Sequence, residues 1–272
     1  MRRPEHEGLT HRTPAHRAAA PTIVATERPF EVVAIEQATP RIRRLWLRPA
    51  AGALGFRPGQ YVQLGDAASV LPPRSYSIAN APRPDGLLTL LVARFDHGSI
   101  SGWVHESLAV GDQVLVSGPY GAFVDDPHAT APALFLAAGA GYAPIRALLE
   151  ASLAVGRRRQ LTLLFSARTE ADVIDAAQLA EWQRRRRRFR FLRTLTREPG
   201  PPPLGRIPAL LPSLALPLRD CDVFIAGMPD FVRACAATAR ALGADATRLR
   251  TELFALEPQP WYEAAPDAAQ TR

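Results

Sequence analysis

The spacing of hydrophobic and polar residues changes about halfway along the chain. Over residues 30–123, short runs rich in β-branched and aromatic residues are separated by Gly, Pro and Asp, a rhythm typical of a small antiparallel barrel or sandwich. After residue 127, strands of buried type alternate with amphipathic helices, which indicates a parallel, doubly wound sheet. The expected strands are 31–35, 43–47, 61–64, 87–93 and 113–117, then 133–137, 161–165, 189–192, 223–226 and 249–254, with helices after 141 and near 176–187 and 229–242.

These two patterns predict two domains. We expect a disordered leader over residues 1–26, an antiparallel β-barrel domain over 27–127, an α/β domain with a parallel sheet over 128–256, and a C-terminal tail over 257–272. No apolar run is long enough to cross a bilayer, and the first residues lack the apolar core of a secretory signal. A cytoplasmic protein with no membrane partner is therefore expected.

Composition narrows the chemistry. The chain contains no lysine, so its net charge of +7 comes from arginine and Schiff-base chemistry on a lysine amine is excluded. A basic surface favours an acidic partner without choosing among nucleic acid, a membrane surface and an acidic protein. The arginine run at 184–188 points around more than one face of a helix, so a solvated helix end is favoured over partner docking, and no nucleic-acid partner is expected. Cys221 and Cys235 are too few for a four-cysteine iron–sulfur cluster, and the histidines lack metal-ligand spacing, so no metal is expected.

The most distinctive motif is the run RSYSIAN at residues 74–80, which follows a Pro-Pro turn. Strand alternation places Arg74, Tyr76 and Ile78 on one side of an extended chain. A guanidinium fork beside an aromatic ring and a hydroxyl suits a ligand with a phosphate and a flat conjugated ring, such as a flavin nucleotide. Taken alone, the same residues more often form an ordinary strand with a surface arginine and a half-buried tyrosine.

This run resembles the flavin-binding signature of the ferredoxin–NADP reductase family, and further landmarks of that family follow in order. The segment RPGQYV at 57–62 resembles the one just upstream, GSIS at 98–101 resembles the pyrophosphate-binding turn, and GPYGAF at 118–123 resembles the run that closes the flavin domain. The resemblance extends over about residues 30–254. It implies that the barrel domain holds FAD and that the α/β domain binds NADH or NADPH.

The resemblance also assigns roles to single residues. It implies that Arg74 holds the FAD pyrophosphate, Tyr76 packs on the isoalloxazine and the Ser77 hydroxyl reaches flavin N5. The GSIS turn would offer backbone N–H groups at a helix start, although an ordinary serine-capped helix explains it equally well. The flavin-binding positions implied are Arg74, Tyr76, Ser77, Ile78, Ala79, Asn80, Gly98, Ser99, Ile100 and Ser101.

The second half carries the matching nucleotide positions. A Gly-rich turn, GAGYAP at 139–144, lies between an expected strand and helix, where two glycines let the backbone approach a pyrophosphate. Ala140 stands where family members often have a hydroxyl. After the next strand, Arg168 could clamp a 2′-phosphate while Glu170 could serve a ribose hydroxyl, so the choice of nicotinamide stays open. The implied positions of this half are Gly139, Gly141, Pro144, Arg168, Gly227, Met228 and Phe254.

Two positions near the end of the chain bear on reactivity. The turn AGMP at 226–229 resembles the family's Cys-Gly-x-Pro turn beneath the nicotinamide, with Ala226 in the cysteine position. Glu252 corresponds to the family's acidic position near the flavin, and Phe254 corresponds to a shield for the ring, a role that Trp261 or Tyr262 could also fill. The candidate catalytic residues are Tyr76, Ser77 and Glu252.

Together these features imply an FAD-dependent NAD(P)H oxidoreductase for electron transfer to a separate acceptor, such as a ferredoxin or an oxygenase component. A fused iron–sulfur domain is not expected, because a cysteine-rich module is missing. Two alternatives stay open. One is reduction of free flavin or another diffusible acceptor, and the other is a catalytically weakened flavin-binding protein, which Ala140 and Ala226 suggest.

Overall fold

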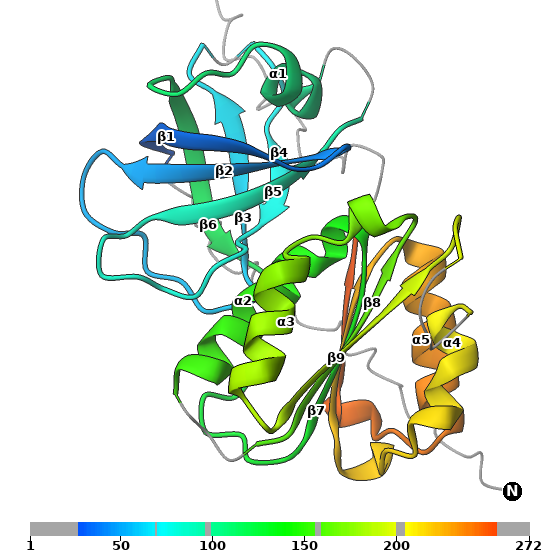
Figure 1. Cartoon of the computed structure of the whole chain (residues 1–272). Helices are drawn as coiled ribbons and strands as arrows, with labels where there is room; N and C mark the ends of the chain where they lie inside the picture. The colour runs from blue at the N-terminus through cyan, green and yellow to red at the C-terminus, as the bar shows by residue number, and fades with distance from the viewer. Residues whose placement is uncertain (1–26, 69, 96–98, 156–158, 200–204, 255–272) are drawn as a thin grey trace, which may run out of the picture.

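The computed structural model describes residues 27–68, 70–95, 99–155, 159–199 and 205–254. They form a curled antiparallel sheet that lies against one end of a parallel α/β sheet (Figure 1). Both sheets are of the kind that the hydrophobic pattern predicts. The expected leader and tail, with Gly98, Trp261 and Tyr262, lie outside the described residues.

The first domain is a six-stranded antiparallel sheet that closes on itself. Its strand order is β4-β3-β6-β1-β2-β5, and a bridge between Ile78 and Leu90 joins the two outer strands. Alternate residues such as Val32, Leu45 and Val62 point inward and are fully buried. The elements are β1 (Arg28–Thr39), β2 (Ile42–Pro49), β3 (Tyr61–Asp66), β4 (Arg74–Ser77), β5 (Leu88–Ala93), α1 (Ile100–Glu106) and β6 (Gln113–Tyr120).

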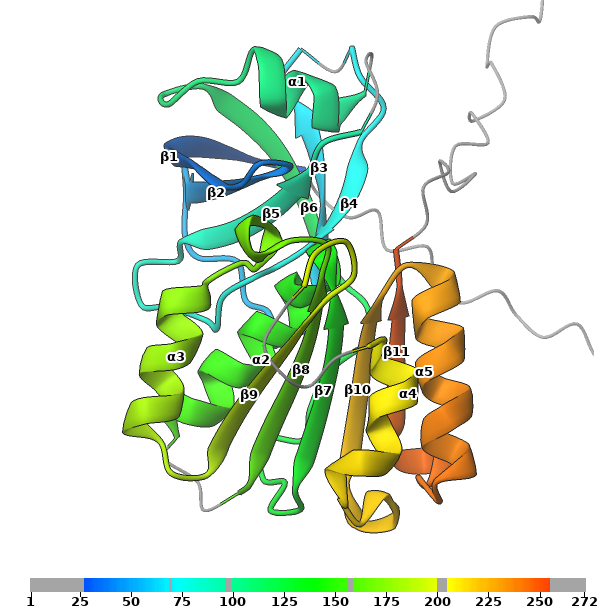
Figure 2. The same cartoon turned by 45° about the vertical axis from the view of Figure 1, so that its right-hand side comes forward.

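The second domain is a five-stranded parallel sheet in the order β11-β10-β7-β8-β9. Helices α2 and α3 cover one face, and α4 and α5 cover the other (Figure 2). Successive residues of the central strands point to opposite faces, so Phe135 packs under α2 while Leu136 packs under α5. The elements are β7 (Ala133–Ala138), α2 (Tyr142–Ala154), β8 (Leu161–Ala167), α3 (Ala176–Arg185), β9 (Phe189–Leu195), α4 (Ile207–Leu210), β10 (Asp222–Gly227), α5 (Pro229–Ala241) and β11 (Leu249–Leu253).

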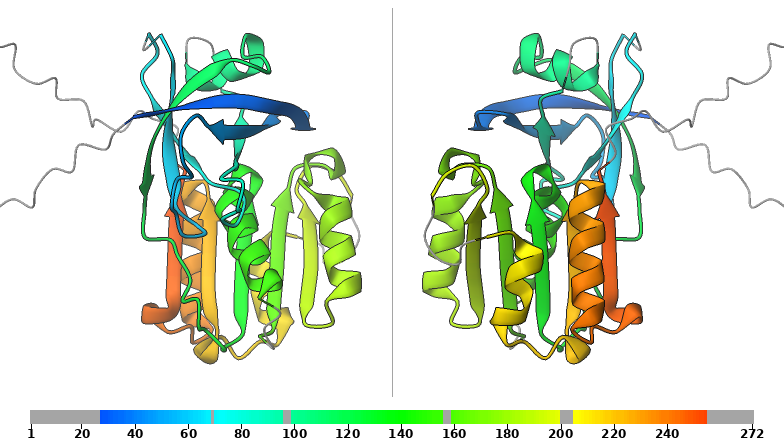
Figure 3. Two further views of the ribbon diagram at one scale, coloured as in Figure 1. Left: turned by 90° about the vertical axis from the view of Figure 1, so that its left-hand side faces the viewer. Right: turned by 90° about the vertical axis from the view of Figure 1, so that its right-hand side faces the viewer.

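The order of these strands creates a crevice at the carboxyl ends of the strands. The chain runs from β7 outward through β8 to β9, then returns to place β10 on the other side of β7. The helices that follow β7 and β10 therefore lie on opposite faces of the sheet, and ligands of open α/β sheets bind where the strand order reverses. The carboxyl ends of these strands point toward the barrel domain (Figure 3), so the crevice faces it.

The arginine run lies partly beyond its helix. The sequence predicts a helix near 176–187, but α3 ends at Arg185, and Arg186 is already extended at φ −119° and ψ 94°. Arg184 and Arg185 both pair with Glu181 one turn earlier. Residues 186–188 form the exposed connection to β9, as a solvated helix end requires.

Candidate functional site

Strand β4 presents its two sides to different surroundings. Tyr76 lies opposite Val62 of β3, and Arg74 lies opposite Leu64, so both share the side of the strand that faces the barrel core. The ring of Tyr76 packs against that core, and burial raises the pKa of its phenol. This register has the alternation that the sequence predicts for Arg74 and Tyr76.

Ser77 belongs to a row of residues on the opposite side. It pairs with Tyr61 of β3, which in turn pairs with Tyr120 of β6, and the two tyrosine ring centroids are 5.5 Å apart. Burial raises the pKa of Tyr61, and the charge of Glu252, near the end of β11 in the other domain, raises it further. Burial raises the pKa of Glu252 itself to about 7. Ser77, Tyr61, Tyr120 and Glu252, here called the facing row, thus come from both domains.

The residues that follow β4 have mostly internal roles. Ile78 and Ala79 are fully buried, and Asn80 is 3% exposed. The Asn80 side chain accepts a hydrogen bond from the backbone N–H of Thr89 at 2.6 Å and donates one to the carbonyl of Leu87 at 3.0 Å. These three residues therefore offer a ligand little side-chain surface.

Helix α1 begins where the GSIS turn predicts a helix start. The Ser99 hydroxyl caps it by accepting from the backbone N–H of Gly102 at 3.4 Å, and it lies 2.9 Å from the Ser101 hydroxyl. Ile100 and Ser101 are buried. The serine-capped helix is therefore present, and an anion site at the same turn stays a proposal because Gly98 is outside the described residues.

Two glycine turns meet at the crevice of the parallel sheet. A Cβ atom on Gly141 would lie 2.2 Å from the Ala226 carbonyl oxygen, so only glycine allows the turn after β7 to approach the end of β10. Gly139 has φ +54°, and a Cβ placed there would meet no described atom within 4 Å. The backbone N–H of Phe254 donates to the Gly227 carbonyl at 2.9 Å. The turns that hold Gly139, Gly141, Gly227, Met228 and Phe254 are thus brought together, with Pro144 buried in the first turn of α2.

Such an arrangement fits a dinucleotide. The open backbone at Gly139 begins a 3-10 turn that leads into α2 three residues later, and the unsatisfied N–H groups and the dipole at such a helix start favour a phosphate. A glycine without a Cβ leaves room for that phosphate to contact the main chain. The residues present therefore match the chemistry of a pyrophosphate group.

Arg168 also lies at the carboxyl ends of the parallel strands, one strand away from the turn after β7. It follows β8 and is exposed, and its carbonyl accepts a hydrogen bond from the backbone N–H of Arg197 at 2.8 Å. Two exposed arginines therefore stand on neighbouring loops. The Glu170 carboxylate is already paired with Arg193 at 2.8 Å, so it is less free to bind a ribose hydroxyl than the sequence suggests.

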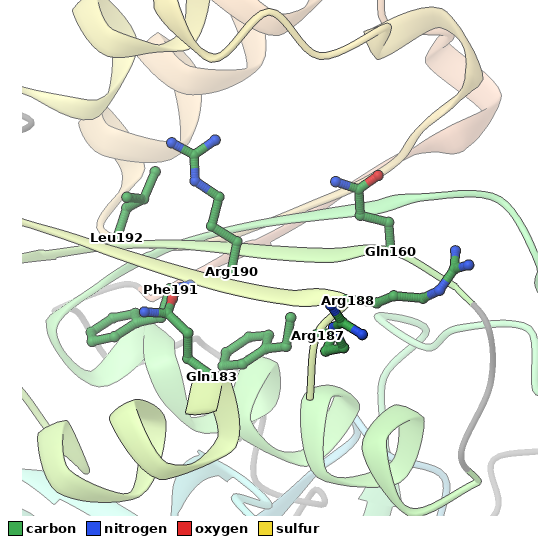
Figure 4. A pocket seen from close by; sticks show the side chains of 8 residues that line it. Gln160, Gln183, Arg187, Arg188, Arg190, Phe191 and Leu192 are labelled. Carbon is green, nitrogen blue, oxygen red and sulfur yellow. Dashed lines mark hydrogen bonds between the residues drawn. The ribbon is translucent and has the colours of Figure 1, made fainter. Parts of the chain in front are cut away.

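A cavity of about 590 Å³ lies at the other end of the parallel sheet, near the start of β9 (Figure 4). There the amide oxygen of Gln183 accepts from the backbone N–H of Phe191 at 2.6 Å. Because this cavity adjoins the amino ends of the strands, it is remote from the glycine turns. The lining residues are Gln160, Gln183, Arg187, Arg188, Phe189, Arg190, Phe191 and Leu192.

Tyr61, Tyr120 and the ion pairs between the domains were not among the residues predicted from the sequence. Tyr61 lies in the landmark run RPGQYV, and Tyr120 lies in the run GPYGAF. Both positions could therefore be found from the sequence, but the pairing between them could not. The described residues include no group of three or more His, Cys, Asp or Glu side chains suited to a metal ion. No helix among them is both long and apolar enough to span a membrane.

Comparison with known proteins agrees with this geometry. Residues 30–124 match the oxidoreductase FAD-binding domain, and residues 135–237 match the oxidoreductase NAD-binding domain. Ferredoxin–NADP reductase B of Sorangium cellulosum is 37% identical over 222 residues, which cover 75% of this chain and 88% of that protein.

Longer relatives share the same two domains. The propane 2-monooxygenase reductase component of Rhodococcus jostii is 32% identical over 177 residues, 65% of this chain and 48% of that protein, so the match spans about half of its length. The crystal structure of the Amycolatopsis cytochrome P450 reductase GcoB superposes with a TM-score of 0.77 at 28% identity, covering 87% of this chain and 73% of that one. The chain belongs to the ferredoxin–NADP reductase family of FAD-containing, NAD(P)H-dependent oxidoreductases.

Proposed function

We propose that this protein uses FAD to take electrons from NADH or NADPH and passes them to a separate protein, a ferredoxin-like carrier or an oxygenase component. The observation that carries the proposal is the facing row, in which Ser77, Tyr61 and Tyr120 lie on neighbouring barrel strands and Glu252 of the parallel sheet is near enough to Tyr61 for its charge to raise the pKa of Tyr61. The named relatives, a ferredoxin reductase and an oxygenase reductase component, support the class of acceptor. Reduced nicotinamides are cytoplasmic metabolites, so we place the protein in the cytoplasm.

The barrel residues would bind and orient the flavin. We assign the Arg74 guanidinium to the FAD pyrophosphate, because its planar fork donates two parallel hydrogen bonds to a phosphate. Tyr76 supports the ring from the barrel side, and the buried Ser77 hydroxyl offers a hydrogen bond at the facing row. When bound, FAD supplies the two-electron acceptance and one-electron release that no amino-acid side chain provides.

Glu252 is the one group of the facing row that can change charge near neutral pH. Burial raises the pKa of its carboxyl to about 7, so it holds a proton in part of the molecules at physiological pH. Its neighbour Tyr61 keeps its proton, because burial and the charge of Glu252 raise the pKa of Tyr61. Glu252 is therefore our candidate for holding or releasing a proton beside the flavin.

The α/β residues would bind the nicotinamide nucleotide. Gly139, Gly141 and the start of α2 receive the pyrophosphate, and the Gly227–Met228 turn beside them receives the nicotinamide end. Arg168 receives the adenosine end. The matched ranges 30–124 and 135–237 fall inside proposed domain boundaries of 27–127 and 128–256, which supports that division.

Purified protein tests this function directly. We expect a yellow protein that releases FAD on denaturation, is bleached anaerobically by NADH or NADPH, and then reduces a ferredoxin faster than it reduces free flavin. Bound FAD that neither nicotinamide bleaches would indicate a flavin-binding protein without turnover. Colourless protein that cannot be reconstituted with FAD would refute the proposal.

Two arginine variants separate the two cofactor sites. Arg74→Ala removes a charge-assisted contact of about 1.5–3 kcal/mol, so FAD should bind roughly 10- to 100-fold more weakly. Arg168→Ala should retain FAD and lose affinity for the nucleotide that carries a 2′-phosphate. Equal FAD content in the two variants, measured by absorbance after dialysis, would count against the role of Arg74.

A further inference from the structure

A buried carboxylate joins the two domains at a distance from the facing row. Asp175 immediately precedes α3, and its side chain is 7% exposed. One of its oxygens accepts from Arg44 of β2 in the barrel, and the other accepts from Arg146 of α2 at 2.7 Å. The Arg44 and Arg146 side chains are 12% and 16% exposed. A single carboxylate therefore holds one arginine from each domain.

Arg146 extends this connection to the strand proposed to bind the flavin. Its Nη1 atom donates to the carbonyl of Ala79 at 2.6 Å, two residues beyond the end of β4. One helical turn later, the Glu150 carboxylate accepts from the backbone N–H of Ala81 at 2.8 Å and lies 3.3 Å from Arg146. Helix α2 thus holds the main chain at two points just after β4.

The same helix begins at the turn proposed to bind the nucleotide. Tyr142, its first residue, follows Gly141 directly. Its hydroxyl lies 3.4 Å from Asp175, and its ring stacks on Phe165 with centroids 5.1 Å apart. A short rigid path therefore leads from Gly141 through one turn of α2 to Arg146, and from there to Ala79 and β4.

Apolar side chains of both domains form a buried cluster beside these polar groups. Ile42, Ala79 and Leu91 of the barrel belong to the same buried cluster as Ile145 and Leu149 of α2. In this setting a charge needs its partners: without Asp175, Arg44 would keep only Glu36 and Arg146 only Glu150 as ion-pair partners among the described residues, and no carboxylate would join the two arginines. The ion pairs therefore fix the relative positions of Arg44, Asp175 and Arg146. Asp175 also has φ +57°, in the left-handed region that Asp and Asn tolerate better than other residues with side chains.

We propose that Arg44, Asp175 and Arg146 act as positioning residues that fix the distance between the flavin-binding strand and the nucleotide-binding turn. This inference rests on the proposed function. Each cofactor would be bound mainly by one domain, whereas electron transfer between them depends on how the domains are held together. Because a displacement of about 1 Å can cost roughly 100-fold in rate, loosening the cluster should slow the reaction far more than it weakens binding.

Asp175→Asn is the test variant, because asparagine tolerates the same backbone angles and has nearly the same shape. Asp222→Asn is the matched control. The Asp222 carboxylate also accepts from two arginines, Arg159 and Arg248, and is 10% exposed, but it lies at the amino end of β10, where Arg159 also pairs with Asp125 of the segment that leads into β7. Both variants should lose thermal stability, and only the first should disturb the contact between α2 and the chain that follows β4.

The measurements use the FAD-loaded proteins and separate binding from positioning. For Asp175→Asn we expect unchanged FAD content, a dissociation constant for the nicotinamide within about 3-fold of the unaltered protein, and a limiting rate of anaerobic bleaching lowered roughly 10- to 100-fold. The long-wavelength charge-transfer absorbance of the mixed flavin and nicotinamide should weaken. Hydrogen exchange at the Ala81 amide should become faster, because Arg146, which lies 3.3 Å from Glu150, loses the carboxylate that fixes its position. The control should keep the rate, the absorbance band and the exchange pattern.

Three results would overturn the inference. One is an unchanged rate and absorbance band in Asp175→Asn, and another is an equal loss in Asp222→Asn, which would make the cluster only structural. If the unaltered protein held FAD that neither nicotinamide bleached, the proposed function would fail together with this inference. Should Asp175→Asn not fold, Arg44→Met breaks the same bridge from the barrel side, and the same criteria apply to it.

Discussion

One added methyl group tests the close approach of the two glycine turns. Gly141 has φ −59° and ψ −13°, ordinary helical angles, so the backbone accepts alanine without strain. The new Cβ would lie 2.2 Å from the Ala226 oxygen, 2.5 Å from the Ala226 carbonyl carbon and 2.7 Å from the Gly227 Cα. All three are main-chain atoms, which cannot move aside by rotating a side chain.

The size of the effect follows from these distances. Non-bonded carbon atoms prefer separations of about 3.5–4.0 Å, so the two turns must separate by roughly 1 Å. Overpacking of this kind costs about 1–3 kcal/mol, which for a protein of this size lowers Tm by roughly 2–10 °C. If the turns hold the nicotinamide, the same displacement should slow bleaching of the flavin by up to about 100-fold.

Thermal unfolding and stopped-flow bleaching measure both effects, and Gly139→Asn is the control. Asparagine tolerates the φ of +54° at Gly139, where a Cβ meets no described atom within 4 Å. This variant should keep its Tm within about 2 °C while its larger side chain weakens nucleotide binding. A Gly141→Ala protein with the Tm and bleaching rate of the unaltered protein would show that the turns are not in close contact.

Glu252 and the two cysteines are titratable groups whose burial leads to further predictions. Burial raises the pKa of Glu252 from 4.5 to about 7, so the folded protein binds this proton more tightly than the unfolded chain does. The free energy of unfolding should therefore fall between about pH 4.5 and pH 7, by at most about 3 kcal/mol, and Glu252→Gln should remove that slope in urea titrations; an equal slope in both proteins would contradict the burial of Glu252. Burial also raises the pKa of Cys235 to about 12, and Cys221 is buried too. Neither thiol should react with a disulfide reagent near pH 8 until the protein unfolds, and one reactive thiol in the native protein would contradict this.

Periodicity predicted the parts of the fold that depend on local pattern. Alternation identified most barrel strands, because one face of each is buried, and short apolar runs identified the parallel strands, because the central ones are buried on both faces. The same alternation separates Arg74 and Tyr76 from Ser77. The end of α3 was placed two residues too late, since a run of identical charges has no period that marks a boundary.

The pairing of distant residues was beyond this kind of reasoning. Arg44 and Asp175 are 131 positions apart, and nothing in the pattern indicates which of the 33 arginines meets which acid. The hydrogen bonds of Asn80 are a second example. The resemblance places Asn80 among the flavin-binding positions, but it does not indicate that the side-chain amide holds the chain beside β5.

Strand order sets the direction in which a dinucleotide would lie across the sheet. Glu252 lies near the end of β11 and Arg168 follows β8, with β10 and β7 between them, so three strand spacings of about 4.8 Å separate the two positions by roughly 14 Å. A nucleotide whose pyrophosphate rests on the turn after β7 has its two ends on opposite sides of that turn. On the assignment proposed above, the adenosine end, with any 2′-phosphate, would be attracted to Arg168 and repelled by an ionised Glu252. The nicotinamide would then be directed toward the facing row, which includes Ser77 and Tyr61 of the barrel.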